Sequence, residues 1–507
     1  MKNNNRQNQS GQSLIYIIGF VPVLILALLY VYNANMAVNE KTRLQNTMDA
    51  VAFSAATISA REYNFKAYTN RIMVANQVGI AQAVGLQSWI RHIDVLVRNS
   101  ATVVKPIPII GQIFAVLERV SKTITPIMET LMSVLASTTD GLVRIISASQ
   151  FAFSAASFIL ASDVANTVAK ANDADVDELS LISGTNINLS KGAFAANQAA
   201  ALRFTSRFNP DKVSKTAKYP NGPLGSDRAF NAEIKKEDFN RSEEFRNITM
   251  ESLDGFSKER NHRIAGLIVN TLEKRGGTSL LGNDRFSLSR YGSWAAVDTM
   301  SFHVGGRLFG IPIPSKEIVP LGWGAARNGK NTKVKFLDYA RVDTDYFGAK
   351  LEDNKMAATL AAKEFQRKRL IERVPFMGLQ AFYDLTVNGL ISRGPKLRLI
   401  LGKPTAKVRT SGQIGIGKGS VNLEERAAGT PKLYSMAASA AVFSRINEDD
   451  TGGYGDYVRA DGLREYGSLY NPYWQARLEK LPILEKGVMQ AFIVGTALAQ
   501  DIMDLEP

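Results

Sequence analysis

The chain has 507 residues, of which 45% are hydrophobic and 21% are charged. This balance favours a folded chain of two or three domains and excludes a largely disordered one. Lysine and arginine outnumber aspartate and glutamate by 61 to 47, and the net charge of +14 favours contact with an anionic surface. The absence of cysteine excludes disulfides and thiolate sites. Three scattered histidines, His92, His262 and His303, exclude a His-x-x-x-His zinc motif.

A polar leader, residues 1–13, precedes an uncharged apolar run from Leu14 to Tyr32. At about 1.5 Å per residue, a helix over this run spans roughly 28 Å, close to the about 30 Å of a bilayer's hydrocarbon core. Pro22 lies inside the run, where membrane helices tolerate proline. The basic leader places the N-terminus in the cytoplasm. We therefore predict one permanent transmembrane helix at 14–32, with the remaining chain on the outer side.

N-terminal processing offers two alternatives to an uncleaved anchor. A secretory signal peptide usually has an apolar region of about 7–15 residues, shorter than the run found here. Prepilin-type cleavage would fall between Gly11 and Gln12 and would leave the apolar run attached. Prepilins normally carry glutamate at the fifth mature position, where this chain has Tyr16. Permanent anchoring is the preferred interpretation.

After the anchor, residues 33–177 have apolar side chains at helical spacing and predict a helical stalk or bundle. We expect its helices to break at Pro106, Pro108 and Pro126, and again at Asp140-Gly141.

The segment 141–162 is apolar enough to be considered as a second membrane span. Arg144, Gln150 and five serines within it favour an amphipathic, buried helix instead. The prediction is therefore a single span.

The second half of the chain changes character. Residues 178–264 are rich in charge and weakly periodic, which predicts a charged, loop-rich segment. In residues 265–507, short apolar runs alternate with glycine pairs, which is typical of strands, and residues 396–401 alternate charged with apolar side chains. We expect helices over 356–373, 433–444 and 487–505. The predicted fold class is α+β: one transmembrane helix, a helical stalk, and a mixed outer domain containing strands.

Several patterns resemble ligand or catalytic sites but lack defining residues. The run Gly412–Gly419 lacks the Ser or Thr that follows lysine in a P-loop. The acidic run Asp173–Asp177 lacks the glycine and the final glutamate of a calcium loop. No Gly-x-Ser-x-Gly motif accompanies His303, so a structural histidine is the better interpretation. We therefore expect no catalytic residue, no cofactor and no metal.

A basic window, residues 363–435, holds fourteen lysines and arginines against five acidic residues. Such a patch could contact phospholipid headgroups, lipopolysaccharide or an acidic subunit. Its aromatic residues are too sparse for base stacking, which argues against nucleic acid. The candidate anionic contacts are Lys396, Arg398, Lys403, Lys407 and Arg409.

The N-terminal sequence resembles a known module. Gly11-Gln-Ser-Leu, the apolar run and the helix that follows are similar to the start of Tad (tight adherence, Flp) pilus-assembly proteins of the TadE/TadG-like group. In that group, a lone membrane helix continues into an Arg-x-x-Leu-Gln-x-x-x-Asp-Ala-Ala-Ala-Leu-like helix. Four further segments, 68–78, 274–278, 320–326 and 469–478, resemble the longer members. The residues that match the helix pattern are Arg43, Leu44, Gln45, Asp49, Ala50 and Ala52.

This resemblance implies a bacterial inner-membrane protein whose bulk lies in the periplasm and serves assembly or anchoring of a thin pilus, without catalysis. The implied partners are inner-membrane lipid, other pilus-assembly or pilin subunits, and further copies of the chain. We expect Arg43 and Asp49 to meet neighbouring chains. The alternatives are an adhesin, or a tethered envelope hydrolase using acidic pairs such as Glu243/Glu244 or Asp449/Asp450.

Overall fold

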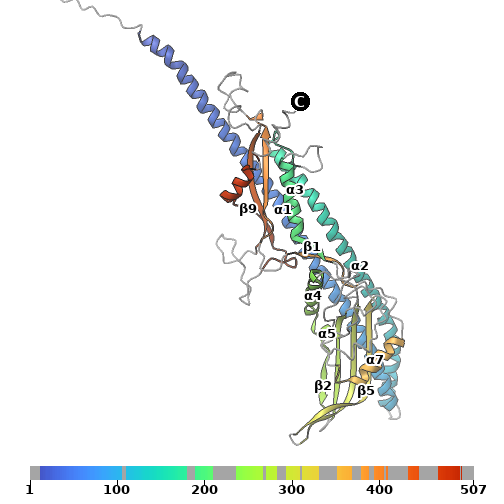
Figure 1. Ribbon diagram of the computed structural model, residues 1–507. Helices are drawn as coiled ribbons and strands as arrows, with labels where there is room; N and C mark the ends of the chain where they lie inside the picture. Colours follow the sequence, from blue (N-terminus) through green and yellow to red (C-terminus); the bar gives the residue numbers. More distant parts are fainter. Residues whose placement is uncertain are drawn as a thin grey trace, which may run out of the picture. The chain divides into compact units, whose positions relative to one another are not determined.

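A computed structural model gives the fold (Figure 1). The parts of the chain that it describes are residues 12–104, 110–179, 189–208, 236–265, 270–281, 293–308, 311–329, 351–367, 378–386, 393–404, 407–408, 432–444, 466–491 and 493. The chain divides into two compact units, each built from separate stretches of sequence. Unit 1 comprises Met1–Asn64, Phe153–Thr205 and Leu385–Pro507, and unit 2 comprises Phe65–Ala152 and Ser206–Asp384. The predicted domains, by contrast, followed one another in chain order.

Two long helices, α1 (Gln12–Val104) and α2 (Ile110–Asn172), supply the predicted helical part and contribute to both units. The predicted breaks at Pro126 and Asp140-Gly141 are wrong, because both sites lie inside α2. A proline removes one helical hydrogen bond. In unit 2 that loss is offset by contacts between the helices, such as the Ser121 hydroxyl bonding the Asp94 carboxylate at 2.8 Å.

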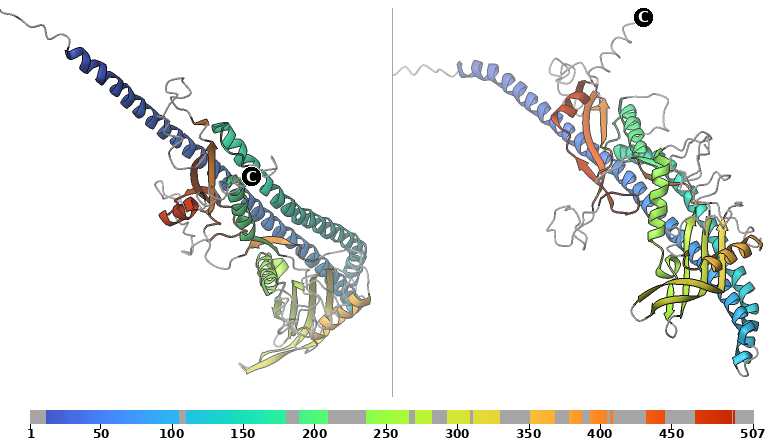
Figure 2. Two further views of the ribbon diagram at one scale, coloured as in Figure 1. Left: turned by 45° about the horizontal axis from the view of Figure 1, so that its top comes forward. Right: turned by 60° about the horizontal axis from the view of Figure 1, so that its bottom comes forward.

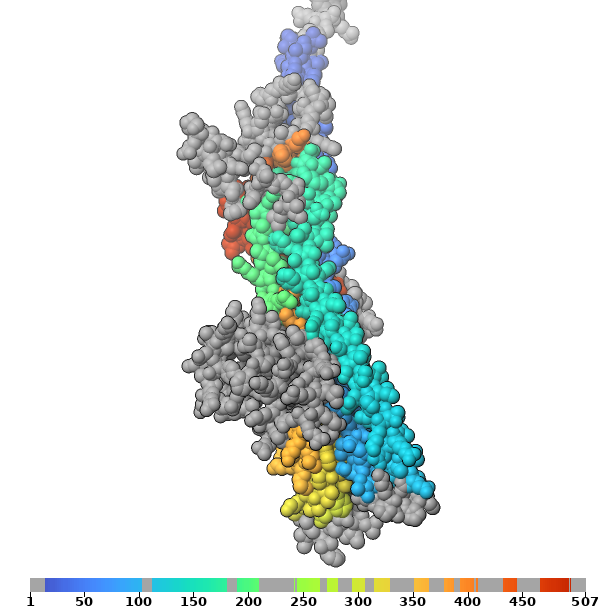
Figure 3. Space-filling model, turned by 90° about the vertical axis from the view of Figure 1, so that its right-hand side faces the viewer, coloured from blue at the N-terminus to red at the C-terminus, as the bar shows by residue number. Residues whose placement is uncertain are grey.

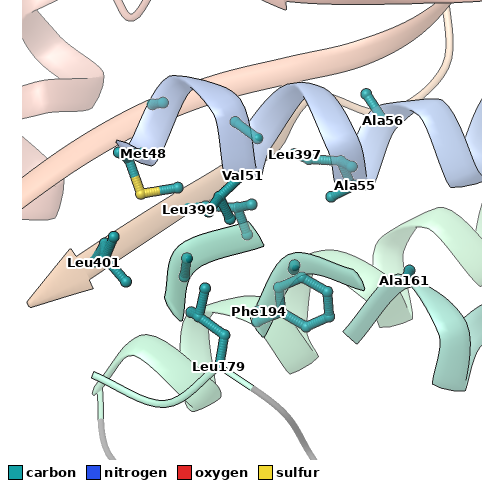
Figure 4. Packing of buried hydrophobic residues seen from close by; sticks show 14 of the residues in the cluster. Met48, Val51, Ala55, Ala56, Ala161, Leu179, Phe194, Leu397, Leu399 and Leu401 are labelled. Carbon is teal, nitrogen blue, oxygen red and sulfur yellow. The ribbon is translucent and has the colours of Figure 1, made fainter. Parts of the chain in front are cut away.

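Unit 1 packs three helical segments against a three-stranded antiparallel sheet. The sheet has the order β7-β8-β9, and α3 lies against β7. The elements that complete the unit are α3 (Leu189–Phe204), β7 (Leu397–Pro404), β8 (Lys432–Phe443) and β9 (Trp474–Glu479). On β7, Leu397, Leu399 and Leu401 point into one core with Met48 and Val51 of α1 (Figure 4). This alternation confirms the predicted strand.

The predicted helix over 433–444 is wrong, because this segment is the central strand β8. Alanine and serine dominate its sequence, and alanine favours helix in isolation. Pairing with β7 on one side and β9 on the other overrides that preference. Small side chains also let α1 approach closely: the Ser439 hydroxyl donates to the Ala52 carbonyl of α1 at 2.6 Å.

Unit 2 contains a four-stranded antiparallel sheet of order β2-β3-β4-β5 (Figure 2). Its strands are β2 (His262–Ala265), β3 (Asn270–Leu281), β4 (Ser293–Leu308) and β5 (Ile311–Gly329). Helix α7 (Lys355–Arg367) packs on β4 and β5, and overlaps the helix predicted over 356–373. The combination of long N-terminal helices with sheets in the C-terminal part is thus confirmed.

The segment predicted as loop-rich, residues 178–264, contains more regular structure than expected. Besides α3 and most of β2, it holds a strand that pairs with β6 (Phe382–Leu385), a helix of 16 residues and a single helical turn. These are β1 (Thr205–Phe208), α4 (Lys236–Glu251) and α5 (Gly255–Lys258). Aromatic packing explains α4: its Phe245 is buried and stacks on Phe382 of β6 at 4.5 Å between ring centroids.

Candidate functional site

The first part of α1 is apolar and exposed. From Leu14 to Tyr32, fifteen large hydrophobic side chains keep between 39% and 78% of their surface open. Figures 1 and 2 show this dark-blue start of α1 extending clear of the other elements of unit 1. Burial begins at Asn33, which is 4% exposed. Water is a poor solvent for so long an apolar surface, whereas a bilayer suits it.

Two described helices, α1 and α2, are long and apolar enough to cross a membrane. The most apolar stretch of α1 is entirely unburied, whereas a third of the corresponding stretch of α2 is buried. The prediction of a single span is therefore not confirmed by length and composition. Of the processing site, Gln12 is the first residue of α1, and Gly11 lies outside the described residues.

Gln45, one of the residues that match the TadE/TadG-like helix pattern, contacts the sheet of unit 1. The Gln45 amide donates to the Met436 carbonyl at 3.1 Å and to the Asp49 carboxylate at 2.9 Å, and its oxygen accepts from the Ser435 hydroxyl at 2.6 Å. Asp49 therefore orients Gln45. Leu44 is completely buried beside them.

Gln45 also closes an open sheet edge. Strand β7 pairs with the first part of β8 on one side, but β9 pairs with β8 only from Ala438 onwards, so no described strand pairs with the preceding residues of β8 on that second side. The side chain of Gln45 bonds the Met436 carbonyl, and Lys41, one turn earlier on α1, bonds the Tyr434 carbonyl. Two side chains of one helix thus take the place of strand hydrogen bonds.

Arg43 and Asp49 both have partners inside unit 1, and the expectation that they also meet neighbouring chains stays a prediction. Asp49 accepts from Gln45, as described above. Arg43 donates to the carbonyl of Asn172, the last residue of α2, at 3.0 Å, and lies 4.0 Å from Asp173. A cation at a helix C-terminus satisfies free carbonyls and favours the helix dipole.

A buried ionic cluster, formed by Lys403, Glu40 and Asp173, joins β7 to α1 and to the end of α2. The Lys403 ammonium lies 2.8 Å from a carboxylate oxygen of each acid, and all three side chains are at most 5% exposed. Burial opposes ionisation, but the hydrogen bonds to Asp173 and Glu40 raise the pKa of Lys403. Burial likewise opposes the charge on Asp173, and the Lys403 hydrogen bond nevertheless lowers its pKa. Lys403 and Asp173 are therefore held in their charged forms.

Asparagine side chains satisfy the backbone at both edges of this sheet. On β9, the Asn64 amide donates to the Trp474 carbonyl at 2.8 Å and accepts from the Trp474 N–H at 2.9 Å. On β7, the Asn197 amide forms the same two bonds with the backbone of Arg398. The Trp474 ring packs edge-on against Tyr63 of α1. The 469–478 segment thus contributes the residue that fixes one sheet edge to α1.

The basic candidates differ in how free they are to meet an anion. Lys403 is buried in the ionic cluster, so its assignment as a surface contact is wrong. Lys396 and Arg398 both pair with Glu485, at 3.4 and 3.0 Å, so part of their charge is used within the unit. Lys407 is exposed, and Arg409 lies outside the described residues.

In unit 2, the 274–278 segment carries a second buried ionic cluster. Arg260 makes two hydrogen bonds to the Asp298 carboxylate, at 2.8 and 3.0 Å, and Lys274 pairs with the same group. Burial opposes the charge on Asp298, but Arg260 and Lys274 lower its pKa. Gly276 is required here because a Cβ would collide with the Asp298 side chain. The segment's residues hold β3 to β4.

The 320–326 segment brings β5 against α1 in unit 2. A Cβ on Gly324 would collide with the Ser88 carbonyl and the His92 N–H, and one on Gly322 would lie 2.8 Å from the Leu96 Cβ. The glycines therefore permit close packing of strand on helix. Burial, chiefly, lowers the pKa of His92 to about 3, so the ring is neutral at physiological pH.

His303 belongs to a buried hydrogen-bond network. The Asn354 amide N–H groups donate to the Glu273 carbonyl at 2.8 Å and to Thr299 at 3.0 Å, so its oxygen faces His303 Nε2 at 2.7 Å. His303 Nε2 therefore carries the proton, and Nδ1 faces the Ser315 hydroxyl at 3.1 Å. That hydroxyl also lies 3.1 Å from the Glu273 carboxylate. The network ties β3, β4 and β5 to the start of α7.

Other patterns of the sequence find structural partners or lie outside the described residues. Asp173 serves the ionic cluster, and Asp177 pairs with Lys432 at 3.0 Å. Glu244 pairs with Arg241 at 2.9 Å. Among the described residues, no three His, Asp or Glu side chains are placed to share a metal ion. The glycine-rich run 412–419 and the pair at 449–450 lie outside the described part.

The N-terminal part of α1 matches the model of a known protein family. Residues 11–58 match the family model Tad, described as "Putative Flp pilus-assembly TadE/G-like". This segment is TadE/G-like. The match covers the exposed apolar helix and the docked helix that follows it, and it suggests a role related to the pilus. Searches of curated proteins and of solved structures returned no match.

Proposed function

We propose that this chain is a non-enzymatic, membrane-anchored component of Tad/Flp-type pilus assembly that works through helix packing and subunit contacts. Its single anchor, residues 14–32, lies in the bacterial inner membrane, the N-terminus is cytoplasmic, and the bulk of the chain lies in the periplasm. The observation that carries the proposal is the exposed apolar start of α1, which continues without a break into the docked signature helix.

The contrast between an exposed first part and a packed later part of α1 supports this proposal. Within the described part of the chain the large side chains of residues 14–32 stay exposed, and residues from Glu40 onwards are fixed by hydrogen bonds and the ionic cluster. Because one continuous helix carries both parts, the TadE/G-like segment couples the position of the anchor to that of the folded unit. A groove of about 450 Å³ beside Gln45 and Asp49, lined also by Lys41, Lys480 and Lys486, offers a basic contact surface for another subunit.

The roles of the other conspicuous residues support a structural rather than a catalytic protein. The sequence segments that resemble longer family members supply packing glycines and buried ion pairs. The most enzyme-like arrangement is the Ser315–His303–Asn354 series, and it also bonds Glu273 and joins three strands to α7. We therefore assign it to stability.

The proposal can be tested by counting pili by electron microscopy. The cells are of the strain that naturally encodes the chain, with their own copy inactivated and a variant expressed in its place. Replacing residues 14–32 by an unrelated apolar span of equal length should preserve pili, and deleting them should abolish pili and release the chain from membranes. Ser315→Ala should keep normal pilus numbers. Pili formed without the anchor would refute anchoring, and loss of pili with a stably folded Ser315→Ala would favour an enzyme.

A further inference from the structure

One face of α2 in unit 2 carries a regular, exposed apolar stripe. Its members follow one another at alternating intervals of four and three residues, and each exposes between 43% and 61% of its surface. We call this stripe the α2 seam. It consists of Ile113, Leu117, Val120, Ile124, Ile127, Leu131 and Val134.

The seam is separate from the face that α2 uses inside unit 2. On the inner side, Glu129 pairs with Arg91 of α1, Ser121 bonds Asp94, and Met132 and Ala136 are buried. The seam lies on the other side, and Figure 3 shows the cyan part of α2 open along the face in view. Packing among the described residues therefore does not account for these seven side chains.

The spacing of the seam specifies what can cover it. An average interval of 3.5 residues is the heptad repeat, which keeps an apolar line facing a neighbouring helix of the same repeat. A membrane surface does not require that interval and usually attracts a helix with excess positive charge. Here Glu118 and Glu129 balance Arg119 and Lys122. A helix, rather than lipid, fits this face.

We propose that the occupant is the α2 seam of a second copy of this chain. Charged residues at the positions flanking a heptad seam set the choice of partner, and like charges there would oppose pairing of identical helices. The flanking positions here are Val116, Thr123, Thr130 and Ser137 on one side and Phe114, Ser121, Met128 and Leu135 on the other, all uncharged. A second copy supplies the same repeat, and in the proposed function copies share one membrane, which raises their effective concentration.

The available area is sufficient for a stable pair. With Val116 and Leu135, nine side chains are about half exposed. A side chain of this size removes roughly 90 Å² of apolar surface from water when it is completely covered. Because these are only half exposed, they offer on the order of 400 Å² per copy and about 800 Å² for two copies. Because about 60% of an interface is apolar, the whole contact would bury on the order of 1,300 Å², within the range of stable complexes.

Cysteine cross-linking tests this proposal, because the natural chain has no cysteine to give a background. Single variants of the full chain, Ile124→Cys and Ile127→Cys, are oxidised in native membranes, with Lys122→Cys, an exposed position off the seam, as the control. We expect a disulfide-linked dimer from seam positions and none from the control. Coexpressed pairs of seam variants extend the test to antiparallel copies, in which different positions meet.

A charge placed in the seam gives an independent readout. Ile127→Glu should abolish the dimer formed through Val120→Cys, while Lys122→Glu should leave it intact. Ile127→Glu alters an exposed position, so protease resistance of unit 2 should be unchanged. The proposal would be overturned by a cross-link of Ile127→Cys to a protein of different mass or by labelling of the seam with a lipid-phase reagent. Cross-links that do not follow the alternating four- and three-residue spacing of the seam would also overturn it.

This inference rests on the proposed function only for the shared membrane, and the two can fail separately. Alkaline extraction of the same membranes reports the anchor, whereas the cross-link reports the seam. An anchored chain without cross-links would contradict the seam alone. A cross-linked chain that is extracted would contradict the anchor alone.

Discussion

Removing the cation of the unit 1 ionic cluster should selectively destabilise unit 1. Lys403→Met deletes the ammonium that lies 2.8 Å from both Glu40 and Asp173. The two carboxylates are 5% and 2% exposed, so the substitution leaves buried negative charges facing one another without their lysine. Lys407→Met is the matched control, because Lys407 is an exposed lysine that follows Lys403 closely in the sequence.

Breaking a buried ion pair by removing one partner typically costs about 3–5 kcal/mol. For a unit of this size, about 4 kcal/mol corresponds to a fall of roughly 8–16 °C in its melting temperature. Further replacement of Glu40 by Gln and Asp173 by Asn should restore most of the loss, since neutral groups carry a smaller desolvation penalty. Lys407→Met should change stability by less than about 0.5 kcal/mol.

The cost of Lys403→Met should also depend on pH. In the natural chain the pKa of Asp173 is lowered, so its stabilising contribution is present at neutral pH and lost as the pH falls through the acid range. The pKa of Lys403 is raised, so the stabilisation that its charge provides persists until the pH exceeds the pKa of a free lysine. Without Lys403, burial raises the pKa of the carboxyls. The difference between the two proteins should therefore be largest near pH 7 and shrink towards pH 4.

Hydrogen exchange monitored by mass spectrometry can localise the effect in the detergent-solubilised full chain. Peptides from the docked part of α1 and from β7 should lose protection in Lys403→Met, while peptides from the unit 2 sheet serve as an internal reference. If Lys403→Met and Lys407→Met exchange alike at β7, or if the difference persists unchanged at pH 4, the charged cluster does not stabilise unit 1 as argued.

Two further substitutions test the packing assigned to sequence segments, each against a matched control and by thermal unfolding. Asn64→Ala should cost about 1–3 kcal/mol, because both backbone groups of Trp474 lose their partner. Asn76→Ala, which removes only an exposed hydrogen bond within α1, should cost less than about 0.5 kcal/mol, and equal effects would contradict edge closure. Gly324→Ala should destabilise unit 2 by about 1–3 kcal/mol, because the added Cβ collides with α1. Gly79→Ala, where nothing lies within 4 Å of the added Cβ, should stabilise it by about 0.5–1 kcal/mol. A tolerated Gly324→Ala would disprove close packing of β5 on α1.

The sequence was informative wherever the signal is local. The uncharged run at 14–32 and the register of the signature helix follow from periodicity within a few turns. Strand β7 was predictable because its charged and apolar residues alternate. These features depend on neighbours in sequence, so a single sequence contains them.

The remaining features depend on residues far apart in the chain. Lys403 stood among surface cations in the sequence, and its partners are 363 and 230 residues away. Strand β8 resembles a helix until β7 and β9 pair with it. Gln45 and Asn64 gave no signal for their roles, because a side-chain amide that replaces strand pairing has no periodicity of its own. Only the resemblance to the Tad group marked Gln45.

The central claim is that one exposed apolar helix holds the chain in the inner membrane with its folded bulk outside. Thiol labelling in cells with a permeabilised outer membrane tests it most directly, using Asn5→Cys and Lys407→Cys in the cysteine-free chain. A reagent that cannot cross the inner membrane should label Lys407→Cys at once and Asn5→Cys only after lysis, with both proteins retained in the membrane after alkaline extraction. Labelling of Lys407→Cys only after lysis, or recovery of the folded chain in the periplasmic fluid, would contradict the account.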